Sequence, residues 1–143
     1  MGLVEKYIEI EKAHKELCEQ LYNKIYFIHE NIGKDYRTQD RWFNGGSEIT
    51  DVREKDGFAV ITYEYFRYDL YDDDIYIKKE LLDMSEEEIL KNKDTLKAEL
   101  ELYNQKQLKR LEDAEKEEKL QAKKREYKRL QKQLQELESD LGK

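Results

Sequence analysis

Residues 54–68 of the chain read EKDGFAVITYEYFRY. The Asp56-Gly57 pair supplies the positive φ angles that a tight hairpin turn requires. Residues 58–68 are rich in the β-branched and aromatic side chains typical of strands. The stretch therefore predicts an antiparallel hairpin, in which a short strand at residues 49–53 pairs with residues 58–68.

Side chains of a strand alternate between its two faces. One face of the longer strand would carry Phe58, Val60, Thr62, Glu64 and Phe66, and the other Ala59, Ile61, Tyr63, Tyr65 and Arg67. Neither face is cleanly polar. We expect one face to pack on a helix, and the other to be partly covered or to meet a partner.

An acidic loop at residues 69–73 and a third strand at residues 74–78 are predicted next. Grouped aspartates there have three readings: a solvated hairpin tip, carboxylates presented to a basic groove on a partner, or a Ca²⁺ or Mg²⁺ site. The central glycine and terminal glutamate of the EF-hand pattern are missing, which makes the metal reading the weakest of the three.

Upstream, residues 3–32 predict a helix that ends at Gly33, a residue suited to a helix C-terminus. Its stripe has helical spacing and suits burial against a sheet or helix. The stripe is formed by Val4, Tyr7, Glu11, His14, Cys18, Leu21, Ile25, Ile28 and Ile32, widened by Leu3, Ile10 and Leu17. Residues 34–46 form a connector with two large aromatics, Trp42 and Phe43, beside an Asn-Gly-Gly turn.

Downstream, Ser85-Glu86-Glu87-Glu88 matches a capping box, in which Ser85 accepts from the amide of residue 88 and Glu88 reaches back to the amide of Ser85. Met84 and Ile89 stand where a hydrophobic staple would place them. A single helix is predicted to start here and to continue without interruption to Gly142, with Ile89, Leu96, Leu100 and Tyr103 packed on the domain.

The distal part of that helix has two segments. Residues 112–119 form a solvated bridge with favourably oriented Glu112–Lys116 and Glu115–Lys119 pairs. Beyond it an a/d seam, broken only by Lys123, predicts a homodimer or higher oligomer. The seam consists of Leu120, Tyr127, Leu130, Leu134, Leu137 and Leu141.

The predicted fold class is α+β: an N-terminal helix, a three-stranded antiparallel sheet and a long C-terminal helix with a distal coiled-coil seam. We divide it into a small helix-plus-sheet domain at residues 1–84 and a charged helix at residues 85–143, which is coiled-coil-like from about residue 120.

Composition narrows the classes of function. Charged residues make up 43% of the chain and apolar residues 38%, against about 25% and 45–50% in typical domains. The net charge of −7 argues against binding to a nucleic-acid backbone, which needs a basic surface. A single cysteine, no long apolar run and no signal-peptide pattern predict a soluble protein of the cytoplasm, without membrane contact.

Catalytic and metal-binding motifs have little support. His14 and Cys18 are four residues apart on one helical face, but a zinc site needs about four ligands, and the only other histidine is His29. We read the pair as part of the core stripe. No nucleophile or phosphate-binding motif is present. We therefore expect no metal, no cofactor and no enzymatic activity, and keep a metal-dependent enzyme as an alternative.

Tyrosines are dense beside the acidic run, and tyrosine is a frequent interface residue. Plain sheet packing explains them equally well, whereas base stacking would need more basic residues nearby. We predict a partner-binding surface formed by Tyr63, Tyr65, Arg67, Tyr68, Asp69, Tyr71, Asp72, Asp73 and Asp74.

Short aromatic strands followed by YIKKELLDMSEEE at residues 76–88 and a charged helix resemble small uncharacterised accessory proteins of bacteriophages and mobile elements. The resemblance covers residues 47–143 and is one of style. It implies a protein that binds and disables a host protein, as anti-CRISPR inhibitors of host defence do. A structural or scaffolding coiled-coil oligomer is the alternative.

Overall fold

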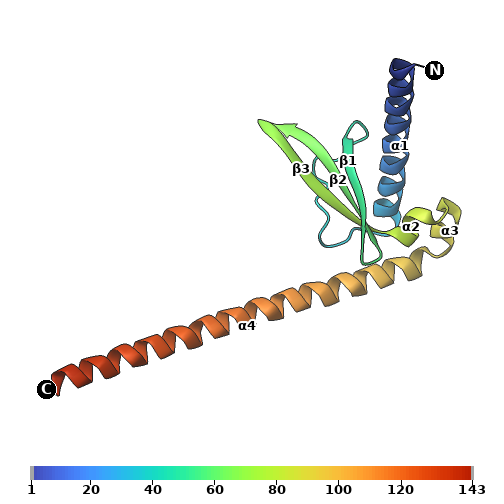
Figure 1. The fold of residues 1–143 in the computed structure, drawn as a ribbon. Coiled ribbons are helices and arrows are strands. Elements are labelled where there is room, and N and C mark those ends of the chain that lie inside the picture. Colours follow the sequence, from blue (N-terminus) through green and yellow to red (C-terminus); the bar gives the residue numbers. More distant parts are fainter. Residues whose placement is uncertain (1, 143) are drawn as a thin grey trace. The chain divides into compact units, whose positions relative to one another are not determined.

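The computed structural model describes residues 2–142 and confirms the α+β class (Figure 1). The elements in chain order are α1 (Leu3–Asn31), β1 (Glu48–Lys55), β2 (Phe58–Arg67), β3 (Asp69–Lys78), α2 (Lys79–Asp83), α3 (Glu86–Lys91) and α4 (Lys93–Leu141). The chain separates into two compact units between Asn104 and Gln105, so that α4 contributes its first turns to one unit and the rest to the other.

The three strands form an antiparallel sheet in the order β1-β2-β3. The hairpin turn between β1 and β2 is confirmed, with φ angles of 53° at Asp56 and 82° at Gly57. The predicted alternation along β2 agrees with its packing, because Ile61, Tyr63 and Tyr65 of one predicted face all lie in or against the core cluster.

The predicted acidic loop at residues 69–73 is wrong. Strand β3 begins at Asp69, directly after a reversal at Tyr68, whose φ is 66°. Aspartate is a poor strand former, but the register gives this segment cross-strand partners. Tyr71 lies opposite Tyr65, and Asp74 accepts a 2.6 Å hydrogen bond from Thr62. These contacts override the local propensity of the acidic run.

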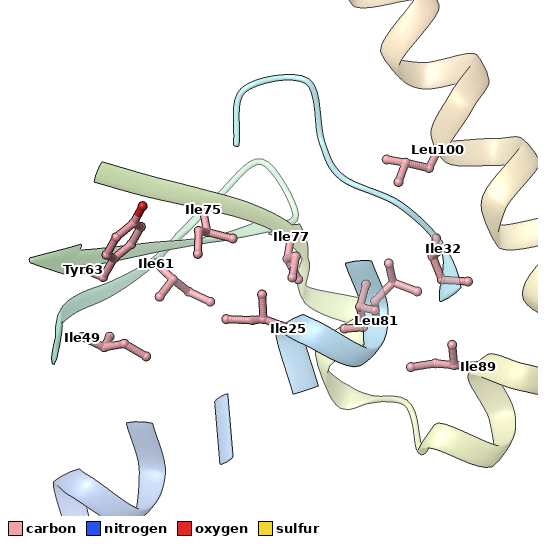
Figure 2. Packing of buried hydrophobic residues seen from close by; sticks show 11 residues of the cluster. Ile25, Ile32, Ile49, Ile61, Tyr63, Ile75, Ile77, Leu81, Ile89 and Leu100 are labelled. Carbon is pink, nitrogen blue, oxygen red and sulfur yellow. The ribbon is translucent and has the colours of Figure 1, made fainter. Parts of the chain in front are cut away.

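The core lies between one face of the sheet and the C-terminal half of α1. Figure 2 shows the side chains of Ile61 and Ile75 from the sheet close to Ile25 of α1. Ile89 and Leu100 complete the cluster from α3 and the start of α4, and Leu96 and Tyr103 pack against it. The predicted packing of these helical residues on the domain is confirmed.

The N-terminal half of α1 differs from the expectation of a buried stripe. Leu3, Ile10 and Leu17 are 85%, 69% and 53% exposed. Within the described residues, burial along the stripe begins at Cys18. The sheet covers only the last turns of α1, because the inward-facing apolar side chains of its strands lie near those turns.

The connector between α1 and β1 packs around β3. Thr38 Oγ1 donates to the Tyr76 carbonyl and accepts from the Tyr76 amide, and the Gln39 amide donates to the Asp74 carbonyl. Arg37 forms a two-point ion pair with the buried Asp35, and its guanidinium lies 4.2 Å from the centre of the Tyr76 ring. The connector thus covers part of the sheet face opposite α1.

The prediction of one uninterrupted helix after Ser85 is also wrong. A short helix, α2, precedes Ser85, and α3 ends at Lys91, with Asn92 as its C-cap at φ −107° and ψ 15°. The side-chain amide of Asn92 donates to the Glu88 carbonyl at 2.9 Å. Such local side-chain bonds compete with the helical ladder, and α4 starts anew at Lys93.

Half of the capping box is confirmed. Ser85 Oγ accepts a 3.1 Å hydrogen bond from the Glu88 amide, while the Glu88 carboxylate accepts from the Ser85 hydroxyl rather than from its amide. Met84 packs against the core cluster and Ile89 lies in it, as the staple requires.

Ser85→Ala is expected to lower the free energy of unfolding by about 1 kcal/mol, because the first turn of α3 loses a side-chain acceptor. Urea titration of the full chain followed by circular dichroism measures this change. Ser85→Asp, which keeps an acceptor at the cap, serves as the control. Equal stability of the alanine and aspartate variants would contradict the role assigned to this cap.

Candidate functional site

Three aromatic rings form a stack on the α1-facing side of the β2–β3 hairpin. The centroids of Trp42 and Tyr65 are 6.0 Å apart, those of Tyr65 and Tyr71 are 5.8 Å apart, and both pairs are stacked. Register explains the second contact, because Tyr65 and Tyr71 are directly opposed. The connector explains the first, since it carries Trp42 from a remote part of the sequence onto this face.

Two arginines and a hairpin-tip tyrosine border the stack. The guanidinium of Arg67 lies 4.6 Å from the centre of the Trp42 ring, and that of Arg41 lies 5.0 Å away. Tyr68, at the hairpin tip, is 93% exposed. We name the groove of about 290 Å³ at this place the aromatic patch; it is lined by Trp42, Tyr65, Arg67, Tyr68 and Tyr71.

Tyr63 belongs to the core, although it was predicted as a partner-binding residue. It is fully buried, and its hydroxyl donates a 2.7 Å hydrogen bond to the Gln39 carbonyl. Burial raises the pKa of Tyr63 to about 12, which keeps the hydroxyl protonated as a donor. Its ring packs against that of Tyr65 in the aromatic patch, with the two ring centroids 5.9 Å apart.

The four aspartates of the predicted surface lie on opposite faces of the sheet. Asp69 and Asp73 are opposite Arg67 and Tyr63, and therefore share the face of the aromatic patch. Asp72 and Asp74 point to the other face. Because strand β3 alternates, the acidic run does not form one continuous surface.

A polar groove of about 470 Å³ occupies the other face and includes Asp72 and Asp74. Its central ion pair joins Arg53 and Asp74 at 3.4 Å, and Thr62 donates to the same carboxylate. Arg37 borders the groove from the connector. Both arginines of this groove and Asp74 have ion-pair partners within the chain.

Sequence reasoning missed Trp42 and Arg41 as members of the candidate site. Trp42 lies more than 20 positions before Tyr65, and no periodic pattern links the two. The available signal was two large aromatics next to an Asn-Gly-Gly turn, a combination typical of a loop that carries side chains to a specific place.

A further cavity of about 330 Å³ lies beside α1 and includes His29 and Asp40. His29 Nδ1 is 3.5 Å from the Asp40 carboxylate, which also pairs with Lys34 at 2.8 Å. Burial outweighs this charge and lowers the pKa of His29 to about 4. Nε2 of His29 is buried and has no hydrogen-bond partner within residues 2–142.

The core position predicted for His14 and Cys18 holds only for Cys18, which is half-buried and packs against the core cluster, whereas His14 is exposed. His14 Nε2 and Cys18 Sγ are 3.5 Å apart on a largely exposed part of α1. Within residues 2–142, no group of three or more histidine, cysteine, aspartate or glutamate side chains is arranged to hold a metal ion.

The distal seam is exposed along its whole length. Leu120 is 46% exposed and Leu141 is 87% exposed, with the other seam residues between them. In the preceding bridge, the predicted Glu112–Lys116 and Glu115–Lys119 ion pairs are confirmed at 3.0 and 3.1 Å.

Comparison with known proteins gives no match to any family model, curated protein or solved structure. Along the described part of the chain, every helix is too short or too polar to cross a membrane.

Proposed function

We propose that the protein is a non-enzymatic protein-binding module and that the aromatic patch is its recognition surface. The observation that carries the proposal is the stack of Trp42, Tyr65 and Tyr71, with Tyr68 fully open at the hairpin tip. Trp, Tyr and Arg are the side chains that contribute most to binding energy at protein interfaces.

Preorganisation supports this assignment. A side chain held in place before binding loses less conformational entropy when a partner docks. Tyr65 and Tyr71 are held by the sheet register and by each other, and Trp42 contacts both the Tyr65 ring and the guanidinium of Arg67. Asp69 and Asp73 supply polar groups on the same face.

The proposed biological setting is inhibition of a host protein in the host cytoplasm by a phage-encoded binder. Small size, net negative charge and a binding face built of aromatic and polar side chains suit such a role. In this proposal the distal seam joins copies of the chain, which would add avidity to the recognition surface.

The assignment of the aromatic patch is tested with two double variants of the full chain. Each replaces two exposed residues of the β2–β3 hairpin by serine, one pair on the face of the patch and the other pair on the opposite face. Tyr68→Ser/Tyr71→Ser removes exposed aromatic surface from the patch. Phe66→Ser/Leu70→Ser removes 77% and 60% exposed apolar residues from the same hairpin. Because Phe66 and Leu70 are paired on the opposite face, they are the matched control.

A partner is first identified by affinity capture with the unaltered chain and mass spectrometry, and each affinity is then measured by calorimetry. We expect Tyr68→Ser/Tyr71→Ser to weaken binding about 30-fold, the loss typical of a hot spot. The control variant should bind within about threefold of the unaltered chain. Equal affinities of the two variants would overturn the assignment of the patch.

A scaffolding protein is the second candidate, and the exposed seam favours it. Under that function, substitutions in the patch would leave activity intact, while Leu130→Glu/Leu137→Glu would abolish it. Comparing the activity of the patch variant Tyr68→Ser/Tyr71→Ser with that of the seam variant Leu130→Glu/Leu137→Glu therefore separates the two candidate functions.

A further inference from the structure

The exposed seam of α4 carries charged side chains whose pattern distinguishes between two orientations of a helix pair. This inference rests on the proposed self-association through that seam. The seam residues follow one another at alternating steps of three and four positions from Leu120 to Leu141, and Lys123 occupies one of these positions. The flanking positions closest to a paired helix include Lys119, Lys124, Glu126, Gln133 and Asp140.

A parallel pair would bring like charges together. Each seam residue then faces its own copy, so Lys123 would meet Lys123 of the second copy inside the seam. At the flank, a residue pairs with the one about five positions further along the other helix. Lys119 of each copy would therefore face Lys124 of the other, which adds two further repulsive contacts.

An antiparallel pair avoids all of these contacts. Leu120 then faces Leu137 of the second copy, Tyr127 faces Leu130, and Lys123 faces Leu134, along which its methylene stem can lie. At the flanks Lys119 faces Asp140 of the second copy, an attractive pair that occurs twice by symmetry. Glu126 faces the neutral Gln133 and keeps its 2.6 Å ion pair with Arg129 of its own chain.

Sliding the antiparallel pair by one heptad is less favourable. Leu130 would then face Leu134 of the second copy, and Lys124 would gain Glu138 as a partner. However, Glu126 would face Asp140 twice, and Leu120 would lose its apolar partner. The first register also has one like-charge flanking pair, Glu117 against Glu138 of the second copy, so the flanking charges do not separate the two registers. The first register is favoured because Leu120 then lies within the overlap of the two helices and keeps an apolar partner.

We infer that two copies of the chain pair through residues 119–141 of α4 in antiparallel orientation, with Leu120 against Leu137 of the second copy. In this arrangement the Gln105 residues of the two copies lie about 70 Å apart, at about 1.5 Å per residue of helix. The domains preceding them are thus attached at opposite ends of the pair. Such a dimer engages two separate partner molecules or two distant sites.

One substitution distinguishes the three arrangements. In the inferred register, Asp140→Lys places a second positive charge against Lys119 of the other copy, and we expect the dimer dissociation constant to rise about tenfold. In the slid register the introduced lysine would meet Glu126 and tighten the dimer. In a parallel pair position 140 lies beyond the last flanking partner, so the constant would stay the same.

The control for this substitution is a reversal of charge at both positions. Lys119→Glu/Asp140→Lys restores the attractive pair and should return the dissociation constant to within about threefold of the unaltered chain. A lysine in the last turn also favours the helix itself through its dipole. A weaker dimer in Asp140→Lys therefore cannot result from a less stable helix. Sedimentation equilibrium of the full-length chains measures each constant.

Disulfide crosslinking gives an independent reading of the orientation. In a Cys18→Ser background, which removes the single native cysteine, we expect a mixture of Leu120→Cys and Leu137→Cys chains to crosslink under mild oxidation. Leu137→Cys alone should not, because the two copies of residue 137 lie about 25 Å apart in the inferred register.

Each outcome has one meaning. Self-crosslinking of Leu137→Cys, or a dimer unaffected or tightened by Asp140→Lys, would overturn the inferred arrangement while leaving self-association intact. At about 100 µM, helix pairs of micromolar affinity are almost fully associated. A chain that still sediments as a monomer at this concentration would overturn both the inferred arrangement and the proposed self-association. Neither result bears on the aromatic patch, whose test is the affinity of the serine variants.

Discussion

Tyr63→Ala is expected to lower the free energy of unfolding of the sheet domain by about 3–5 kcal/mol, the usual cost of truncating a buried aromatic residue. Tyr63 is fully buried in β2, lies 4.9 Å from the ring of Phe43, and supports Tyr65. Since small domains are stable by about 5–15 kcal/mol, this loss is a large part of the total. Urea titration monitored by tyrosine and tryptophan fluorescence measures it.

Tyr63→Phe is the matched control, because it keeps the ring and removes the hydroxyl that donates to Gln39. We expect a loss of about 1 kcal/mol for this single hydrogen bond. If the phenylalanine variant were as unstable as the alanine variant, the hydrogen bond rather than ring packing would dominate, contrary to the role described for Tyr63.

His29 is expected to make the protein lose stability as the pH falls from about 6.5 to about 4. Burial lowers the pKa of His29 in the folded chain to about 4, from an ordinary value of 6.5. Between these values the unfolded chain binds a proton that the folded chain does not, so acid favours unfolding. The contribution of the neutral imidazole to the free energy of unfolding is fully present above pH 6.5. It falls by about 3 kcal/mol once the pH reaches about 4.

His29→Phe removes the titrating group and leaves Asp40 paired with Lys34, which is 2.8 Å from it. The difference in unfolding free energy between the unaltered chain and this variant, measured by urea titration at several pH values, isolates the contribution of the imidazole. We expect that difference to be constant above about pH 6.5 and to change by about 3 kcal/mol below it. A difference that does not vary with pH would contradict the burial of a neutral His29.

The sequence predicted those parts of the fold that depend on local chemistry. Asp56-Gly57 specified the first hairpin turn, and Ser85 with Ile89 specified the start of a helix. Each of these signals lies within a few residues of the structure it determines, and turn and cap geometry depend on little else.

Predictions failed where a distant contact or a single side chain determined the structure. Residues 69–73 have the composition of a loop, yet β2 provides a complete set of partners for them, and they form a strand. At Asn92, the backbone leaves helical geometry and the side-chain amide bonds to the Glu88 carbonyl, so α3 ends in a stretch that otherwise has helical spacing. Propensity alone does not carry either kind of information.

Only part of the aromatic patch was predicted, because one of its residues comes from a distant part of the sequence. Tyr65, Arg67, Tyr68 and Tyr71 are neighbours in the hairpin, so their shared location followed from sequence proximity and strand alternation. Trp42 joins them only because the connector binds the edge of β3 through Thr38 and Gln39. That path depends on hydrogen bonds from Thr38 and Gln39 to the backbone of a strand about 35 residues later, which no periodic pattern reveals.

The binding of the connector to β3 also restricts how another protein can attach to this sheet. Many partners bind by adding an extended segment to an unpaired strand, using the free amides and carbonyls of its edge. Around Asp74 and Tyr76 those groups are already occupied by Thr38 and Gln39. The other edge strand, β1, carries charges of both signs along Glu48–Lys55, a composition that discourages a further strand from pairing. Both edges therefore disfavour extension of the sheet by another strand, whether from another protein or from a second copy. Under the proposed function, this leaves the side chains of the sheet faces as the surface for recognition.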